Sequence, residues 1–438
     1  EQLFQARGTF LDANPGFHLA AEVLREPYLT YIYNIGEGLA SLRWWIGSVS
    51  CRSGVISKSF QQVCYLKVAL DLVEKWDGPG NLVLVLEESL LPALAQNLKT
   101  TKQKGIRLLK GHRPFPLSSV GDLLRMLAHR TFFLAREGSR VLQARRLVSR
   151  PRLDGPPATI IFSWVTSESI KEGVEFHKTF YGNLIEELER RGSLVAIVPI
   201  IWKELDYSLV LSRLRQMPQP FLAPHRYLGL GDLLRAALAT TARPRLPEQL
   251  PSFEGMDIEG VFEADLRHHW ISNAASDALL TRDLVRRWAS RGFSIERFIY
   301  VYENQPYERA LCWEAQLRFP GASVVGYQHA RAPWMAINMY QAPGGEQAAP
   351  QPHRIVTVGA HTARLLTTNG NNPERVKVGG ALQMGGFFRF RIESDSRGSD
   401  PCPVVLVAAS SRLEEAAELV DMAVQLLPED EGVRFLIK

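Results

Sequence analysis

Short apolar runs of strand length alternate with stretches of helical spacing along most of the chain. In the clearest example, runs at 298–302 and 323–326 flank a segment at 307–317 whose apolar residues recur at helical spacing. Pro306 precedes this segment and suits the first turn of a helix, where its missing N–H has no partner to lose. We therefore predict two parallel strands joined by a helix, with both carboxyl ends at one edge of a sheet.

The same alternation extends to both sides of this segment. Further strand-length runs are at 81–86, 106–109, 159–163, 194–201, 354–359, 375–379, 403–409 and 433–438. Before 81 the pattern is largely helical. Strands that alternate with helices predict an α/β fold with parallel sheets.

Proline and glycine gather at two places that we interpret as boundaries between domains. The segment 151–157 is a predicted linker, and 342–352 is a predicted interdomain hinge. A chain of 438 residues also exceeds one ordinary core. We predict a helical and α/β region at 1–150, a central Rossmann-like domain at 151–341 and the start of a second Rossmann-like domain at 353–438. We expect the two sheets to face a cleft, and the last domain to be incomplete because no covering helix follows its final strand.

The composition narrows the class of protein. Hydrophobic residues make up 46% and charged residues 22%, as in ordinary globular proteins. The net charge of +5 is mild, and the sequence has no lysine-rich block, so we expect no nucleic-acid partner. The arginine-rich helical stretch at 123–147 fits either peripheral association with an anionic membrane or a solvated helix face, and we favour the solvated face.

The cysteines and the apolar stretches bear on the compartment. Cys51, Cys64, Cys312 and Cys402 form no CxxC pair and show no metal-ligand spacing, so we interpret them as small buried residues in a reducing compartment. No apolar stretch approaches the roughly 18 residues of a membrane span, and no secretory signal pattern is present. We expect a cytoplasmic protein, with the inner face of the cytoplasmic membrane as an alternative location.

Polar and aromatic residues follow two apolar runs at the predicted sheet edge. They are Glu303, Asn304 and Gln305 after the first run and Tyr327, Gln328 and His329 after the second. Open parallel sheets bind ligands at this edge. We predict that Glu303 and His329 are acid or base catalysts and that the other four residues bind substrate. The alternative for His329 is a structural histidine whose hydrogen bonds are satisfied.

Four further residues are candidates for binding substrate. Ser163 and Thr166 lie at the end of the run 159–163 and would line the same cleft, although such residues also suit an ordinary turn. Glu308 and Arg309 lie in the predicted helix after Pro306. The alternative for this pair is a surface or interdomain ion pair.

A loop near the carboxyl end is a candidate for binding the donor phosphate. Ser410, Ser411 and Arg412 precede a predicted helix and offer hydroxyls, a guanidinium and a helix amino terminus.

Adjacent His268 and His269 would point about 100° apart on a helix, so they cannot bind one metal ion together. We expect neither a metal nor a cofactor. The sequence contains no GxSxG elbow, Walker loop or complete GxGxxG, which disfavours hydrolase, P-loop and dehydrogenase functions.

The segment YENQPYER at 302–309, followed by GYQH at 326–329, resembles the central signature of bacterial surface-carbohydrate biosynthesis proteins for O-antigen or capsule. These belong among the glycosyltransferases of the GT-B type, which have two Rossmann domains. Similar pieces elsewhere are Trp44-Trp45, 57–59, 181–188 and 376–380. The resemblance therefore extends over most of the chain.

The resemblance implies a metal-independent glycosyltransferase of GT-B-like fold. It would move a sugar from a UDP-, GDP- or CMP-linked donor to a bacterial surface glycan or its lipid-linked precursor, and a CMP-linked acidic sugar is one candidate donor. Two alternatives stay open. The first is a nucleotide-sugar 2-epimerase of the same fold, which needs no acceptor. The second is a catalytically silent glycan-binding subunit of a polysaccharide-assembly complex.

Overall fold

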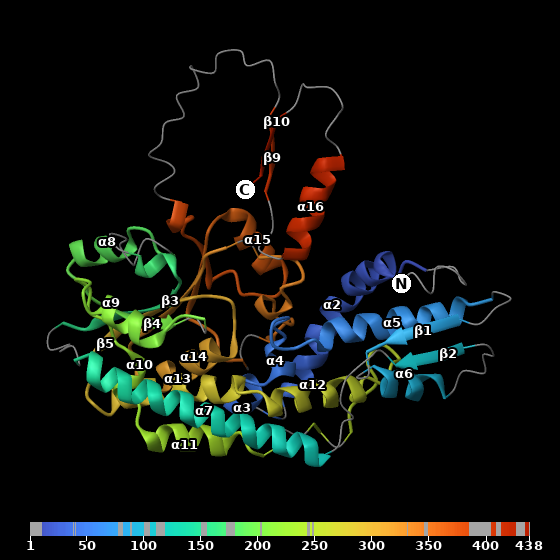
Figure 1. Cartoon of the computed structure of the whole chain (residues 1–438), viewed down its shortest axis with the longest axis horizontal. Helices are drawn as coiled ribbons and strands as arrows, with labels where there is room; N and C mark the ends of the chain where they lie inside the picture. Colours follow the sequence, from blue (N-terminus) through green and yellow to red (C-terminus); the bar gives the residue numbers. More distant parts are fainter. Residues whose placement is uncertain are drawn as a thin grey trace. The chain divides into compact units, whose positions relative to one another are not determined.

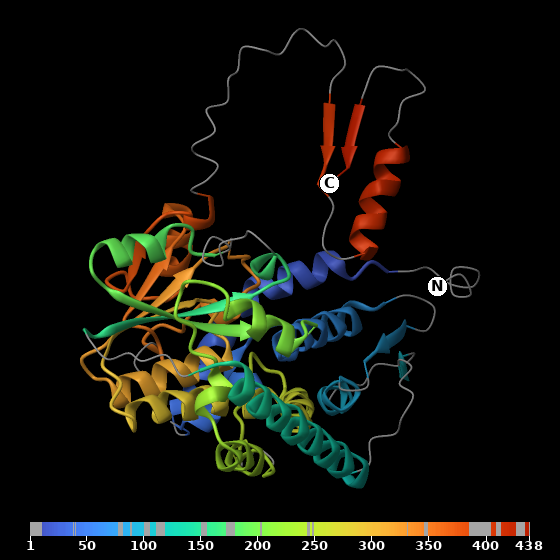
Figure 2. The ribbon, with the colours of Figure 1, turned by 60° about the vertical axis from the view of Figure 1, so that its left-hand side comes forward.

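The computed structural model is drawn in Figures 1 and 2. It describes residues 11–37, 39, 41–77, 82–87, 90–99, 106–110, 119–149, 156–171, 180–201, 204–242, 246–247, 249–330, 332–345, 349–384, 404–408, 413–425 and 434–437. By its contacts the chain divides into two compact units, Glu1–Gly385 and Gly386–Lys438.

A six-stranded parallel sheet is the centre of the first unit. Its spatial order is β4-β3-β5-β6-β7-β8, and every neighbouring pair is parallel. The strands are β3 (Ala158–Val165), β4 (Leu194–Ile201), β5 (Ile295–Val301), β6 (Ser323–Gln328), β7 (Arg354–Thr357) and β8 (Val376–Val378). The sheet confirms the prediction of an α/β fold built on parallel strands.

Alternate residues of the central strands face two separate hydrophobic clusters. Ile160 and Phe162 of β3 belong to one cluster with Trp288, whereas Ile161 belongs to the other with Ile185. Trp288 lies on α13 (Ala274–Ala289) and Ile185 on α8 (Leu184–Arg190), so helices cover both faces of the sheet. A strand buried on both faces needs apolar residues at nearly every position, which explains the continuous apolar runs in the sequence.

The remaining elements of the first unit are mostly helical. They are α2 (Asn14–Glu37), α3 (Leu42–Trp45), α4 (Ser48–Cys51), α5 (Ser59–Lys75), α6 (Leu91–Leu98), α7 (Ser119–Leu147), η1 (Glu168–Ile170), α9 (Tyr207–Leu214), α10 (Pro224–Tyr227), α11 (Leu230–Ala239), α12 (Glu259–Ile271), α14 (Pro306–Arg318), η3 (Ile337–Met339), α15 (Ala360–Thr368) and η5 (Leu382–Met384). The strands β1 (Leu82–Leu86) and β2 (Ile106–Lys110) form a separate parallel pair, as predicted. Among the described residues, no helix is both long enough and apolar enough to cross a bilayer.

The segment 342–352 lies between two strands of one sheet and not between two sheets. It leads to β7, which pairs directly with β6, and the His353 N–H donates to the Val324 carbonyl. The expected interdomain hinge is therefore a connection inside the first unit, and the boundary between the compact units falls at Gly385. Proline and glycine suit any irregular connection, so their presence does not distinguish a hinge between two domains from a connection between two strands of one sheet.

The second unit contains two strands and one helix among its described residues. β9 (Val404–Val407) and β10 (Arg434–Ile437) are parallel neighbours, and α16 (Leu413–Gln425) lies between them in the sequence. Parallel strands need a crossover of this kind. The order strand, helix, strand is the one predicted for 403–438.

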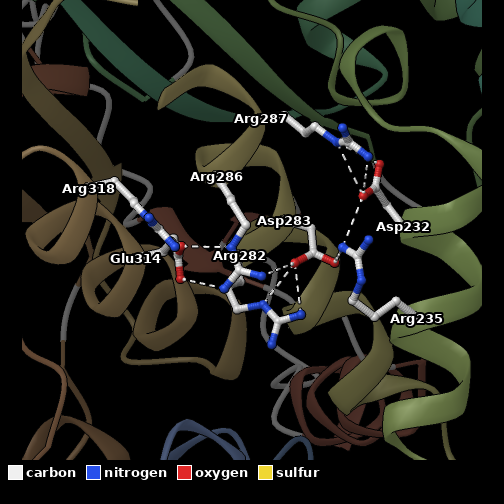
Figure 3. A network of polar contacts seen from close by, with 8 residues as sticks. All are labelled: Asp232, Arg235, Arg282, Asp283, Arg286, Arg287, Glu314 and Arg318. Atoms are coloured by element: carbon white, nitrogen blue, oxygen red, sulfur yellow. Dashed lines mark hydrogen bonds and ion pairs between the residues drawn. The ribbon is translucent and has the colours of Figure 1, made fainter. Parts of the chain in front are cut away.

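Three buried carboxylates join α11, α13 and α14 (Figure 3). The side chains of Asp232, Asp283 and Glu314 are each 1% exposed and paired with arginines. Arg287 lies 2.8 Å from Asp232, and Arg286 lies 3.0 Å from Glu314. Burial alone would raise the pKa of Asp232, but the hydrogen bond and charge of Arg287 outweigh it and hold that pKa below its usual value. The network holds α14 against its neighbours, and the first turn of α14 carries part of the predicted site.

Candidate functional site

The strand order places the predicted residues at a topological switch point. From β3 the chain continues to β4 on one side, whereas β5 to β8 extend in order on the other side. The segments that leave the carboxyl ends of β3 and β5 therefore turn to opposite sides of the sheet. Open parallel sheets bind their ligands at such a point. The polar segments 166–170 and 302–305 both begin there.

The loop after β5 is held by the helix that follows it. The Tyr302 N–H donates to the Tyr327 carbonyl. This hydrogen bond extends the pairing of β5 with β6 one residue beyond the end of β5. The Glu308 carboxylate then accepts the N–H groups of Glu303 at 3.0 Å and Asn304 at 2.7 Å. Asn304 has a φ of 53°, a left-handed conformation that asparagine adopts more readily than most residues. This conformation turns the chain from the strand into α14.

The Asn304 side chain is used inside the fold. It is buried, donates to the Asn338 carbonyl and accepts a hydrogen bond from the Arg309 Nε at 3.0 Å. Asn338 in turn donates to the Glu303 carbonyl. Asn304 was predicted to bind substrate, but its side-chain amide joins the loop after β5 to α14 through Arg309 and to η3 through Asn338.

Glu308 and Arg309 are also buried, and neither predicted role matches their contacts. Arg309 donates at 2.9 Å to the carbonyls of Trp45 and Ser50, more than 250 positions earlier in the sequence. Burial and the nearby charge of Glu303 raise the pKa of Glu308 well above its usual value. Among the described residues, no ion pair joins Glu308 to Arg309, and each is 1% exposed. These side chains position the loop, and Glu308 Oε1 and Arg309 Nη2 have no hydrogen-bond partner among the described residues.

Glu303, Gln305 and His329 stay half-buried at the ends of β5 and β6. Burial raises the pKa of Glu303, and a hydrogen bond with Gln305 offsets part of that rise. Burial also lowers the pKa of His329, because it disfavours the imidazolium. Burial therefore favours the uncharged form of each group: it raises the pKa of Glu303 toward neutral pH and lowers the pKa of His329 below its usual value.

The imidazole of His329 has one nitrogen that is unpartnered among the described residues. Its Nδ1 is buried and makes no hydrogen bond within the described part of the chain. The ring packs edge-on against Phe180, with 5.3 Å between ring centroids. The backbone carbonyl of His329 accepts a hydrogen bond from the Gln383 side-chain amide at 3.1 Å. An unpartnered buried nitrogen needs a further explanation, such as a ligand or a catalytic role.

The other predicted residues of the edge fall into two groups. Tyr327 is buried, and its hydroxyl bonds to the Gly380 carbonyl and the Leu382 N–H, so it anchors the segment that leads to η5. Gln328 is 1% exposed, and its Oε1 is unpartnered among the described residues. Thr166 is half-buried and bonds to Ser169 at 3.0 Å, as in an ordinary turn. It lies at the end of β3 as predicted.

Ser163 does not lie at the edge. The apolar run was predicted to end there, but β3 continues through Trp164 and Val165, so Ser163 lies inside the strand and is 3% exposed. The donor-phosphate candidates Ser410, Ser411 and Arg412 lie outside the described residues.

Sequence reasoning missed the contacts that bring Phe180 to His329. Gly182 has a φ of 52°, and a Cβ built on it would lie 2.2 Å from the Leu382 carbonyl oxygen. The Tyr181 hydroxyl donates to the Phe162 carbonyl at 2.8 Å. These contacts hold the segment before α8 against η5. The pair Tyr181-Gly182 was noted in the sequence, but nothing there indicated what it contacts.

A cavity of about 840 Å³ lies elsewhere in the first unit. Its lining is mainly apolar and includes residues of α3, α4, α12 and α13, together with Arg130 and His269. No residue of the strand-end edge lines it, and it offers no carboxylate. Within the described ranges, no three His, Cys, Asp or Glu side chains converge as a metal ion would need. The strand-end edge is therefore the better candidate for the chemistry.

The contacts of Arg309 predict its contribution to stability. Replacing Arg309 with methionine leaves the Trp45 and Ser50 carbonyls and the Asn304 amide oxygen without this donor in a buried site. We expect a loss of at least about 3 kcal/mol in the free energy of unfolding, measured by chemical denaturation.

Arg190→Met is the matched control, because Arg190 is 70% exposed and pairs only across the surface of α8. It should leave the denaturation curve nearly unchanged. Equal curves for Arg309→Met and the wild type would contradict the role given to Arg309.

Comparison of the sequence with protein-family models and with curated proteins gives no match. The candidate site therefore rests on the switch point, on the half-buried Glu303 and His329, and on the buried side chains that hold them.

Proposed function

We propose that the chain is a glycosyltransferase that moves a sugar from a nucleotide-activated donor to a bacterial surface glycan or its lipid-linked precursor. One observation carries this proposal. Two titratable side chains, Glu303 and His329, follow the adjacent strands β5 and β6 beside the switch point, and burial favours the uncharged form of each, raising the pKa of Glu303 and lowering that of His329. The resemblance of 302–309 and 326–329 to surface-carbohydrate biosynthesis proteins adds the substrate class.

The chemistry of sugar transfer suits this pair. The acceptor oxygen forms a bond to the anomeric carbon while the bond from that carbon to the donor phosphate breaks. The acceptor hydroxyl must lose its proton during the attack, and a positioned base speeds this step. Because its pKa is lowered, His329 is neutral at neutral pH and is able to take that proton. Glu303, whose pKa is raised by burial, is the candidate acid that gives a proton to the departing donor phosphate, and its neighbour Gln305 orients the sugar through hydrogen bonds.

Buried residues hold the segments that carry Glu303 and His329 in place. Glu308 and Arg309 fix the loop that carries Glu303, and Tyr327 anchors the segment leading to η5. Because these groups are already hydrogen-bonded within the fold, little reorganisation is needed when a substrate arrives.

The donor belongs to a second domain in this proposal, as in a GT-B-like enzyme. The parallel pair β9 and β10 with α16 supports a Rossmann-like start at this end of the chain. Ser410, Ser411 and Arg412 are the proposed phosphate contacts there, and the donor is a UDP-, GDP- or CMP-linked sugar. A nucleotide-sugar 2-epimerase and a silent glycan-binding subunit are the competing functions.

Substitution of the two edge residues tests the proposal. Glu303→Gln and His329→Gln should each lower the rate of sugar transfer by about 10²- to 10⁴-fold, because each removes an acid or base group. The rate is measured as acceptor-dependent release of nucleotide from a panel of nucleotide sugars. Release of a free epimerised sugar without an acceptor would favour the epimerase.

Glu168→Gln is the matched control, since Glu168 lies after β3 at the same edge, with 66% of its side chain exposed and a surface pair to Lys171. It should keep the wild-type rate. All variants should unfold at the wild-type temperature. The wild type could turn over no donor while both edge variants still complement a deletion in cells. That result would favour the silent glycan-binding subunit over the glycosyltransferase.

The pH dependence of transfer follows from His329. A base must be neutral, so the rate should fall as the pH drops through the pKa of His329, which lies below its usual 6.5. The residual activity of His329→Gln should lack this acid limb. An unchanged acid limb in that variant would assign the titration to another group.

A further inference from the structure

Two helices of the first unit, α7 and α11, pack against each other and lie along the lower side of both views in Figures 1 and 2. Their inner sides are ordinary core. Met126, Phe133 and Val141 of α7 and Leu233 and Ala236 of α11 are buried. The outer sides therefore face away from the core of the unit.

These outer sides are apolar where a water-facing helix is normally polar. We call this surface the leucine face. Its members are Val120, Leu123, Leu124, Leu127, Phe132 and Leu142 of α7 and Leu230, Leu234 and Leu238 of α11, each at least 45% exposed. Residues 230, 234 and 238 recur every fourth position, so they form one stripe along α11. Exposed apolar residues on two helices that pack against each other indicate a binding partner.

The exposed charges that α7 and α11 themselves carry have a single sign. Every carboxylate of the two helices is buried: Asp122, Glu137 and Asp232 are 4%, 2% and 1% exposed. The burial of these groups is compensated by arginines, as in the pairing of Glu137 with Arg136 and Arg140. The exposed ionic side chains of these helices are cationic. They are Arg125, Arg145, Arg146 and Arg235.

We propose that the leucine face docks on the surface of an anionic lipid bilayer. Leucines at the outer side of a helix enter the boundary between head groups and acyl chains, while flanking arginines meet the lipid phosphates. Apart from Phe132, the apolar members are leucine and valine. Protein interfaces instead concentrate their binding energy in aromatic side chains, and leucine is under-represented among such residues. This docking does not depend on the proposed sugar transfer.

Vesicle sedimentation of the whole 438-residue chain tests the proposal. The probes are vesicles of neutral phosphatidylcholine and vesicles in which part of it is replaced by anionic phosphatidylglycerol. The chain should bind the anionic vesicles, and the bound fraction should fall when salt is added, because salt screens the arginines. Equal binding to both vesicles, or binding to neither, would overturn the proposal.

A double variant identifies the surface. Leu124→Ser with Leu234→Ser removes one leucine from the outer side of each helix and should weaken vesicle binding by about tenfold or more. The control is Leu209→Ser with Leu317→Ser, which changes leucines of similar exposure, 50% and 60%, on α9 and α14. The control should bind like the wild type.

Two further results would contradict a lipid partner. The first is a double variant that binds vesicles as the wild type does while keeping its unfolding temperature. The second is a wild type that forms dimers in solution, with dimers lost in the double variant and vesicle binding unchanged. That result would assign the leucine face to contact with a second copy of the chain.

Discussion

Arg309 holds a guanidinium where only 1% of the residue is exposed, and its hydrogen bonds join three separate parts of the first unit. It lies in the first turns of α14, reaches back to the carbonyls of Trp45 and Ser50, and holds the Asn304 side chain. The hydrogen bonds made by Nε and Nη1 offset part of the cost of burying this charge, while Nη2 has no partner among the described residues. The loop after β5, the start of α14 and the segment that contains α3 and α4 must therefore fit together around it.

The fit around Arg309 distinguishes two groups of residues. One group holds the loop in place, and the other stays half-buried at the strand-end edge. Asn304, Glu308 and Arg309 make hydrogen bonds to one another and to backbone groups, although Glu308 Oε1 and Arg309 Nη2 have no partner among the described residues. Glu303 follows β5 and His329 follows β6, but both stay half-buried, and burial raises the pKa of Glu303 and lowers that of His329. The polar residues after β5 and β6 thus include both the side chains that hold the loop and the candidate catalytic pair, Glu303 and His329.

The sequence predicted the strands well because a parallel strand covered on both faces must be apolar along its length. The run at 194–201 coincides with β4, and the order of strands and helices identified the edge where Glu303 lies. The roles of Glu308 and Arg309 were not predictable, because they depend on partners such as Trp45, 264 positions away. The segment 342–352 was misplaced for a related reason: composition shows an irregular connection but not which strands it joins.

Thermal unfolding of the chain with UDP-, GDP-, CMP- and CDP-linked sugars and the free nucleotides tests the central claim most directly, since it needs no acceptor. A ligand at about 100 times its Kd adds about 2.7 kcal/mol to the free energy of unfolding, enough for a clear rise in the unfolding temperature. The account predicts that one nucleotide class raises it and that the others do not. The same unfolding temperature with every nucleotide and nucleotide sugar would contradict a nucleotide-sugar-dependent enzyme.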